Sequence, residues 1–268
     1  MQGSDLDLPV KAWGPACVAG MHGSGGPMVA QLLSRLGLDL GGAPLVAGPA
    51  DPESRWSSAA FVGINEGVLR ALGGDWDVPP TAEPGWEHAG DLDALRREAG
   101  RLVEGFRVDG PWGWEDPRSS LTLPFWLDLL PETKVVVCVR NPLGAADALR
   151  GQGVTSLAFG LNLWRTYNER LLEALPPGRY AVTHHDAYLY RPQAEIRRVL
   201  DFLGMTAADQ LISLVRSRVV RRTRYRFFEA DELDGFDRTG RLQELYLRLC
   251  EEARWDPDPA SSPALREA

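Results

Sequence analysis

The chain has 268 residues, a formal net charge of −8, 44% hydrophobic residues and 25% charged residues. A chain of this length can bury one large core, so we expect a single domain over residues 14–255. We expect a flexible segment at 1–13 and a disordered tail at 256–268. The negative charge argues against nucleic acid and anionic membranes as partners, because both require a positive field.

The three cysteines, Cys17, Cys138 and Cys250, are too widely spaced for a disulfide framework or a zinc site. Residues 1–9 are polar rather than a signal peptide, and no apolar run is long enough to span a bilayer. We therefore expect a cytoplasmic protein without a metal site. The pattern does not indicate an oligomeric state.

Short apolar runs alternate with helical patterns along the chain. Residues 17–19 predict a buried strand, and a helix follows from Met28 with Gly37 as its cap. Residues 41–52 and 75–90 read as loops. The later pattern predicts helices at 57–72, 91–106, 161–175 and 194–203, and strands at 134–139 and 180–183. This alternation predicts an α/β fold with a doubly wound, mainly parallel sheet flanked by helices.

The segment 20–27, Gly-Met-His-Gly-Ser-Gly-Gly-Pro, lies between the first strand and the first helix. Backbone amides in such a loop can bind an anion, which makes Gly23, Ser24, Gly25 and Gly26 candidate ligand-binding residues. A glycine-rich turn with no ligand is an equal alternative. His22 is a candidate acid or base, or simply part of the loop.

A second motif, Trp-Gly-Trp-Glu-Asp-Pro-Arg, occupies residues 112–118 and precedes the strand that ends at Arg140. Arg140 lies at the carboxyl end of a parallel strand, where doubly wound sheets bind ligands. A solvated strand end is its alternative. Arg118 either contacts a ligand or forms a salt bridge with Glu115 or Asp116.

These motifs, in this order, resemble those of a bacterial branch of the sulfotransferases, which use 3′-phosphoadenosine 5′-phosphosulfate as donor. The resemblance runs from about Val18 to Leu203 and implies a P-loop-like sulfotransferase fold. It places Arg140 at the 3′-phosphate of the donor and Arg118 in the matching arginine position. The run at 221–224 lies near another nucleotide-binding element of the family, although such runs are usually solvated.

The chain departs from the family's pattern at the positions that handle the donor. In the loop, Gly23 replaces the family's arginine, and Gly26 and Pro27 replace its two hydroxyl residues. Glu115 replaces the lysine of the second motif, and Ala148 replaces the serine after the arginine strand. Ser57 lies where many members carry a glutamate near Trp56. Sulfuryl transfer needs cations or preorganised donors around the leaving oxygen, so efficient use of the usual donor is not expected.

Several tryptophans suggest an aromatic acceptor pocket, and core packing is their alternative. The candidates are Trp56, Trp76, Trp112, Trp114 and Trp164. Glu66 could add a carboxylate to this pocket or lie on a surface helix. His184 and His185 follow a strand and could point into the same cleft. For His185 and Asp186, a turn or helix cap is favoured over a place in the cleft by about two to one.

Three functional hypotheses follow for a small-molecule substrate. The favoured hypothesis is a repurposed enzyme of secondary metabolism in which His22, Glu115 and Asp116 perform acid–base chemistry without the usual sulfuryl donor, and no cofactor is certain. The second is a sulfotransferase that uses 3′-phosphoadenosine 5′-phosphosulfate on a hydroxyl or amine acceptor. The third is a non-catalytic binding protein, because a fold does not fix a function.

Overall fold

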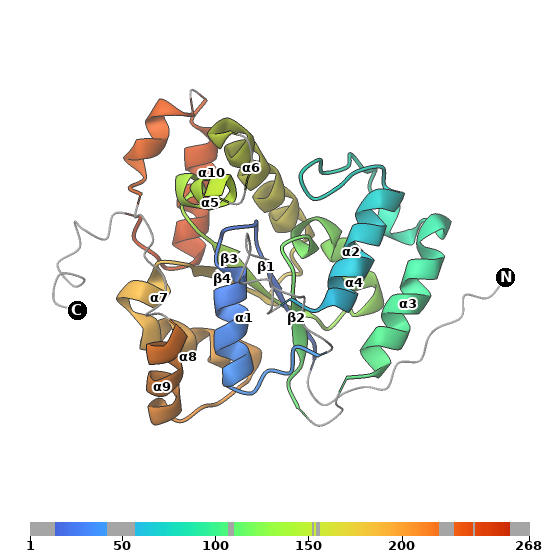
Figure 1. The fold of residues 1–268 in the computed structure, drawn as a ribbon, viewed down its shortest axis with the longest axis horizontal. Helices are drawn as coiled ribbons and strands as arrows, with labels where there is room; N and C mark the ends of the chain where they lie inside the picture. The colour runs from blue at the N-terminus through green and yellow to red at the C-terminus, as the bar shows by residue number, and fades with distance from the viewer. Residues whose placement is uncertain are drawn as a thin grey trace.

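A four-stranded parallel sheet forms the centre of the computed structural model (Figure 1). The structure describes residues 14–41, 57–106, 110–151, 153, 156–219, 228–237 and 239–257. The strand order is β2-β1-β3-β4. The strands are β1 (Ala16–Ala19), β2 (Gly113–Glu115), β3 (Lys134–Val139) and β4 (Tyr180–His184).

Helices pack on both faces of this sheet. In the described ranges the α-helices are α1 (Gly26–Arg35), α2 (Ala59–Ala71), α3 (Asp93–Glu104), α4 (Ser119–Leu129), α5 (Pro142–Gly151), α6 (Leu157–Ala174), α7 (Ala187–Tyr190), α8 (Pro192–Leu203), α9 (Asp209–Val219) and α10 (Arg241–Glu252). Short 3-10 turns are η2 (Trp86–His88), η3 (Gly90–Leu92) and η5 (Asp231–Gly235).

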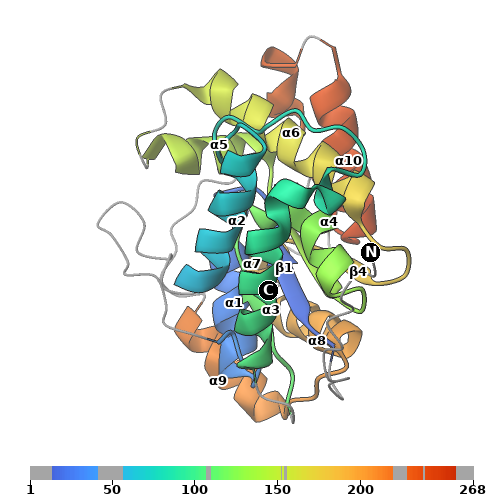
Figure 2. The ribbon, with the colours of Figure 1, turned by 90° about the vertical axis from the view of Figure 1, so that its right-hand side faces the viewer.

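Alternation of side chains along the strands divides the core into two layers. Ala16 and Val18 of β1 face the layer that α1, α8 and α9 cover. Cys17 and Ala19 face the opposite layer, which receives side chains from α2, α3, α4, α5, α6 and α10. Figures 1 and 2 show α2, α3 and α4 together on one side of the molecule. Coverage of both faces confirms the predicted doubly wound arrangement.

The predicted elements are found, with shifts at their ends. The first helix begins at Gly26 rather than Met28, because Pro27 fits the first turn of a helix. Gly37 follows it at φ 109°, as expected of a helix cap. The helix predicted at 161 begins at Leu157, where Ser156 Oγ accepts a hydrogen bond from Phe159 N at 3.2 Å.

The strand predicted at 134–139 agrees with the structure at both ends, and the remaining predicted helices and strands differ from it by at most two residues at either end. The predicted lead-in at 1–13, most of the loop at 41–52, the arginine run at 221–224 and residues 258–268 lie outside the described residues. Within the described part of the chain, no helix combines the length and apolar character needed to cross a membrane.

The parallel register brings four strand ends to one edge of the sheet. Gly20 follows β1, Asp116 follows β2, Arg140 follows β3 and His185 follows β4. Residues at this edge therefore come from segments that are distant in sequence, and this is where parallel α/β sheets place their ligands.

Candidate functional site

The loop at residues 20–27 makes a tight turn from β1 into α1. Gly20 has φ 146°, and a Cβ there would overlap the carbonyl oxygen of Cys138 on β3. Its amide donates to Ser120 Oγ at 3.0 Å, which ties the loop to α4. Gly25, at φ 94°, is the N-cap of α1, and no side chain caps the helix. The loop therefore leads directly to the positive end of α1.

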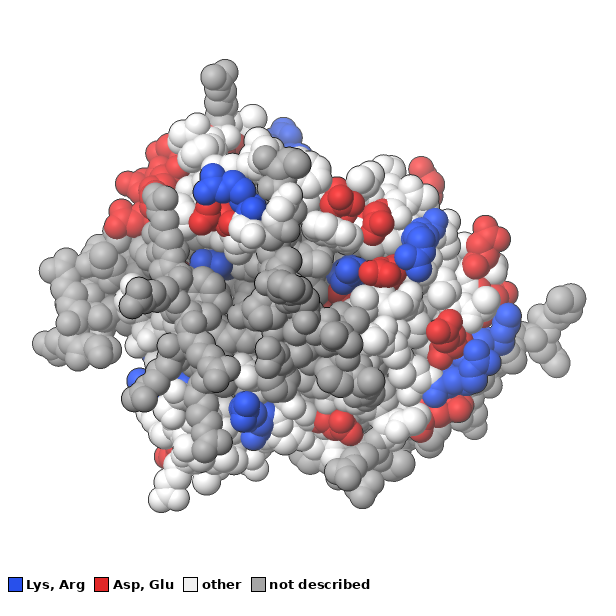
Figure 3. Space-filling view, viewed as in Figure 1, with Lys and Arg blue, Asp and Glu red and all other residues white. Residues whose placement is uncertain are grey.

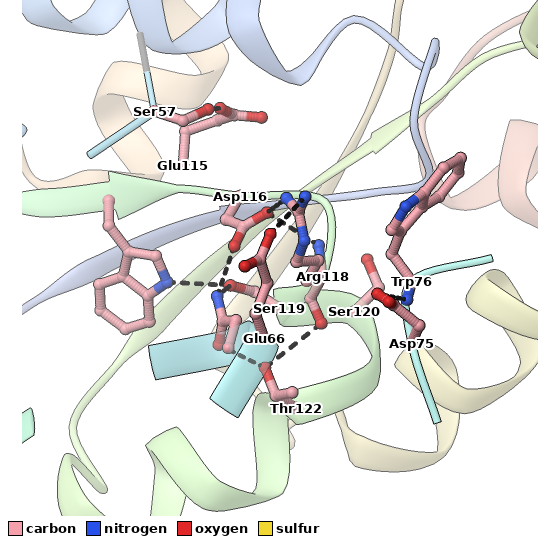
Figure 4. A network of polar contacts seen from close by, with 12 residues as sticks. Ser57, Glu66, Asp75, Trp76, Glu115, Asp116, Arg118, Ser119, Ser120 and Thr122 are labelled. Atoms are coloured by element: carbon pink, nitrogen blue, oxygen red, sulfur yellow. Dashed lines mark hydrogen bonds and ion pairs between the residues drawn. The ribbon is translucent and has the colours of Figure 1, made fainter. Parts of the chain in front are cut away.

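The carboxylate of Glu115 lies against this helix end. Glu115 is the last residue of β2 and is 1% exposed. Its Oε2 accepts a hydrogen bond from Ser57 Oγ at 2.5 Å, and its Oε1 is 2.6 Å from the position of a Cβ on Gly26 (Figure 4). The absence of a side chain on Gly26 thus makes room for the carboxylate. A negative group at a helix N-terminus is stabilised by the helix dipole.

Asp116 points away from Glu115 into a separate polar network (Figure 4). It is 0% exposed, and it accepts from Asn65 Nδ2 at 2.7 Å and from Arg118 through the backbone N at 3.1 Å and Nη1 at 3.0 Å. Asn65 also donates to Ser119 Oγ at 3.2 Å. Both Asp116 oxygens are therefore engaged, which favours a positioning role over proton transfer.

Arg118 is held by carboxylates on two elements. Its Nη1 lies 3.0 Å from Asp116 Oδ1, and its Nη2 lies 3.2 Å from Glu66 Oε1 on α2. Burial lowers its pKa, but the Asp116 and Glu66 carboxylates together outweigh that effect, and the pKa is raised above its ordinary value. The Nε atom is buried and has no hydrogen-bond partner among the described residues. Arg118 thus forms the salt bridge that was one of its two predicted roles.

The His22 side chain extends from the loop to Trp76 and to Tyr167 of α6. Its ring centroid is 4.8 Å from that of Trp76 and 6.0 Å from that of Tyr167, whose hydroxyl donates to Trp76 O at 2.7 Å. Burial, followed by the nearby Arg118 charge, lowers the pKa of His22 to about 3. The imidazole is therefore neutral at pH 7. Its Nε2 is buried without a partner in the described ranges.

Arg140 lies across the same loop and is 5% exposed. Its Nη1 donates to Gly23 O at 3.3 Å, and its Nε is 2.9 Å from the position of a Cβ on Gly144, in the first turn of α5. Trp164 Nε1 donates to the Arg140 carbonyl at 3.1 Å. This arginine packs against the loop and α5, so it is not a solvated strand end.

The two histidines after β4 have different surroundings. His184 Nδ1 accepts from Asp186 N at 3.2 Å, so Nε2 carries the proton and donates to Tyr246 OH at 3.2 Å. Burial lowers its pKa to about 3, and its ring stacks on Trp255. His185 Nδ1 is 2.7 Å from Asp186 Oδ1. The His185 ring contacts the loop, since Cδ2 is 2.7 Å from the position of a Cβ on Gly25.

Asp186 holds its charge beside this loop. Burial raises its pKa, but the hydrogen bond from His185 and the charge interactions with His184, His185 and Arg140 together outweigh that effect, and the pKa is lowered below its ordinary value. The predicted preference for a turn at His185-Asp186 describes the backbone correctly, since Tyr188 N donates to His185 O at 3.2 Å. The cleft alternative applies as well, because the imidazole reaches Gly25, in keeping with the position of His185 at the end of a parallel strand.

The tryptophans divide between the core and the site. Trp112, Trp114 and Trp164 are at most 1% exposed, and Trp114 stacks on Phe61 with ring centroids 4.9 Å apart. This placement favours their core-packing alternative. Trp76 is the tryptophan beside His22, and Trp56 lies outside the described residues. Glu66 is partly exposed and pairs with Arg118, so it lies next to the site.

Comparison with known proteins shows the fold. A scan against protein-family models found no match, and a search of curated proteins found none either. Among solved structures, sulfotransferase STF9 from Mycobacterium avium is 14% identical with a TM-score of 0.56, over 91% of this chain and 78% of that one. The sulfotransferase domain from the curacin biosynthetic pathway is 13% identical with a TM-score of 0.52, over 92% and 99%. The chain has the sulfotransferase fold, as the sequence motifs predicted.

Proposed function

We propose that the protein is a small-molecule enzyme on the sulfotransferase fold that carries out acid–base chemistry without the usual sulfuryl donor. One observation carries this proposal: the Glu115 carboxylate, hydrogen-bonded to Ser57, lies at the N-terminus of α1 beside the loop. In donor-using relatives, as the sequence resemblance implies, that loop faces the negatively charged donor.

The residues of the loop do not fit 3′-phosphoadenosine 5′-phosphosulfate. Gly23 supplies no cation, Pro27 supplies no amide donor, and Arg140 donates to the Gly23 carbonyl. Two like unit charges 4 Å apart in a partly buried site repel by about 4 kcal/mol. A donor phosphate beside the Glu115 carboxylate would meet that repulsion, so we derive no step through this donor.

The same carboxylate supports a role in catalysis. From the family resemblance, a glutamate suited to act as a base is expected near Trp56, where this chain has Ser57. Glu115 Oε2 lies 2.5 Å from the Ser57 hydroxyl, so a carboxylate reaches this region from β2 instead. We assign Glu115 as the proton acceptor and His22, neutral at pH 7, as a second proton-transfer group. Asp116 holds Arg118, whose charge orients the substrate.

The setting of the reaction is part of the proposal. The likeness to a domain of the curacin biosynthetic pathway supports a place in secondary metabolism. All three cysteines are buried free thiols, which supports a reducing, cytoplasmic location. We expect a small molecule, rather than nucleic acid or a membrane, as the partner.

Calorimetric titration with adenosine 3′,5′-bisphosphate tests the proposal. We expect no binding by the wild-type protein at ligand concentrations of about 1 mM, the range of very weak binding. Glu115→Gln keeps the size and the hydrogen bond to Ser57 but removes the charge, so it should gain affinity. Glu132→Gln, at an exposed carboxylate just before β3, is the control and should not. Micromolar binding by folded wild-type protein would refute the proposal.

One observation favours the donor-dependent alternative, a sulfotransferase that acts on a hydroxyl or amine. Ser24 is 1% exposed, and its Oγ has no hydrogen-bond partner among the described residues. A buried hydroxyl without a partner is costly unless a ligand satisfies it. The titration separates the alternatives, because the donor-dependent enzyme must bind the bisphosphate.

Substitution of the proposed catalytic residues separates an enzyme from a non-catalytic binding protein. Once a substrate is in hand, His22→Ala and Glu115→Gln should each reduce turnover at least about 100-fold, the usual contribution of a general acid or base. Unchanged turnover in both variants would show that the assignment of these residues is wrong.

A further inference from the structure

A pocket of about 220 Å³ lies between α6 and the start of α10. Leu161 and Arg165 of α6 line one side, and Phe236, Asp237, Arg241 and Leu242 line the other. None of the described residues that line it belongs to the loop site. In Figure 1, α6 and α10 lie side by side at the top of the molecule, and the two helices are in contact.

Two guanidinium groups of the pocket lack a carboxylate partner in the described part of the chain. Arg165 Nη2 contacts Asn162 Oδ1 at 3.3 Å, and no ion pair of either Arg165 or Arg241 occurs among the described residues. Other arginines nearby are paired: Arg248 of α10 lies 3.6 Å from Glu252. The positive charge of the pocket is therefore not neutralised by an arginine–carboxylate pair.

The Asp237 carboxylate is committed to the backbone of α10. Its Oδ2 accepts from Leu242 N at 2.6 Å and Gln243 N at 3.1 Å, and its Oδ1 accepts from Thr239 Oγ1 at 2.8 Å. Partial burial raises its pKa, but the hydrogen bond from Gln243 N and its other bonds outweigh that effect and lower the pKa below 3.8. Asp237 caps the helix, and its charge is balanced by those donors.

The rest of the pocket is apolar. Leu161 and Leu242 are each 6% exposed and form its buried part. Phe236, at the rim, is 55% exposed, so its ring is accessible to a ligand. An apolar floor, an exposed ring and a few charged groups at the edge are typical of small-molecule pockets.

We propose that this pocket binds a small amphiphilic anion, in which a carboxylate is joined to a compact apolar or aromatic group. The carboxylate lies between Arg165 and Arg241, since guanidinium groups match carboxylate geometry. The apolar part rests on Leu161 and Leu242, beside the Phe236 ring. A volume of 220 Å³ is below the usual range for drug-sized ligands, so the ligand is a small acid.

Ligand-observed NMR titration of the whole chain tests this inference with benzoate and its neutral isostere benzamide. Benzoate should bind at least about tenfold more tightly, because benzamide has no charge to pair with Arg165 and Arg241. Arg165→Gln and Arg241→Gln should each weaken benzoate binding about tenfold. Arg248→Gln removes a positive charge from α10, the helix that carries Arg241, but Arg248 lies outside the pocket. It is the matched control and should leave benzoate binding unchanged.

The outcomes are distinct from those for the loop site. Glu115→Gln should leave benzoate binding unchanged, whatever it does to nucleotide binding. The inference is overturned if benzamide binds as well as benzoate, or if both arginine variants behave like Arg248→Gln. Absence of benzoate binding by the wild-type protein at about 10 mM overturns it as well.

Discussion

Gly26 and Glu115 form a matched pair at the first turn of α1. Any side chain at residue 26 would meet the Glu115 carboxylate, since a Cβ there lies 2.6 Å from Oε1. The buried carboxylate in turn depends on Ser57 and on the helix end for its stabilisation. The missing side chain at residue 26 and the position of the Glu115 carboxylate are thus sterically linked.

Gly26→Ala should destabilise the protein by about 1–3 kcal/mol, the usual cost of overpacking a filled site. Gly63→Ala is the matched control, because Gly63 lies inside α2 and an added Cβ there would have open space around it. That substitution should be neutral or stabilise by up to about 1 kcal/mol, since alanine favours a helix over glycine. Urea unfolding of both variants measures the difference.

The pairing itself is checked by a double variant. In Glu115→Ala protein the added methyl group at residue 26 meets no carboxylate, so Gly26→Ala should then cost much less than in the wild type. Equal costs in the two backgrounds would show that Glu115 is not what restricts residue 26.

His22 should make stability depend on pH. Its pKa is about 3 in the folded protein, lowered mainly by burial, against an ordinary value of 6.5. Between these values the unfolded chain binds more protons than the folded one, so the free energy of unfolding falls as the pH falls from about 6.5 toward 3. His22→Asn should reduce this slope when urea unfolding is measured at pH 7, 6 and 5.

Part of the slope should remain in that variant, because burial also lowers the pKa of His184 to about 3. His88→Asn, at a histidine with a 65% exposed side chain, is the control. A slope identical in wild type and His22→Asn would mean that the His22 imidazole is not held neutral by the fold.

At the level of elements, Asn65 joins α2, the end of β2 and α4. Its Nδ2 donates to Asp116, and its Oδ1 accepts from Thr122 Oγ1 and Trp126 Nε1, each at 2.7 Å. Asn65 is 0% exposed, so water does not replace these bonds. This one amide therefore sets where the second motif and its arginine lie relative to the loop.

Asn65→Ala should lower the free energy of unfolding by about 3 kcal/mol or more, because several buried polar groups lose a partner at once. Asn162→Ala, at an exposed position of α6, is the matched control and should change stability by less than about 0.5 kcal/mol. Chemical denaturation measures both. A loss no greater than that of the control would show that the network does not hold these elements together.

The helices and strands whose apolar residues recur at regular spacing, or form a continuous run, could be predicted from the sequence. β3 is a run of valines, and α1 and α8 carry apolar residues at helical spacing. β2 was not predicted, because Gly113–Glu115 is three residues long and contains no β-branched residue. In α4 the internal Pro124 hides the helical pattern.

The site was predictable only in part. Strand ends and the glycine loop follow from local pattern, so Arg118, Arg140 and His22 could be named as candidates. The contacts of Glu115 with Ser57, and of His185 with Gly25, join residues far apart in the chain and depend on how the layers pack. No local spacing encodes such contacts.

At the scale of the whole molecule, the two layers of the core meet through the sheet. Val136 and Cys138 of β3 face one layer, and Val135, Val137 and Val139 face the other. On the face in Figure 3, positive and negative side chains of the described residues are interspersed, with no broad basic patch. On this face, the described charged side chains therefore form no surface of a single sign.

The cysteines report on whether this core opens as one unit. Cys17 and Cys250 lie in one layer and Cys138 in the other, and all three are buried. Burial raises the pKa of each thiol, that of Cys250 to about 12. Alkylation by iodoacetamide at pH 8 should thus require unfolding, and mass spectrometry should find the same slow rate at all three positions. Faster labelling of Cys250 would show that α10 opens independently of the sheet, in which case the pocket between α6 and α10 belongs to a separately mobile part of the fold.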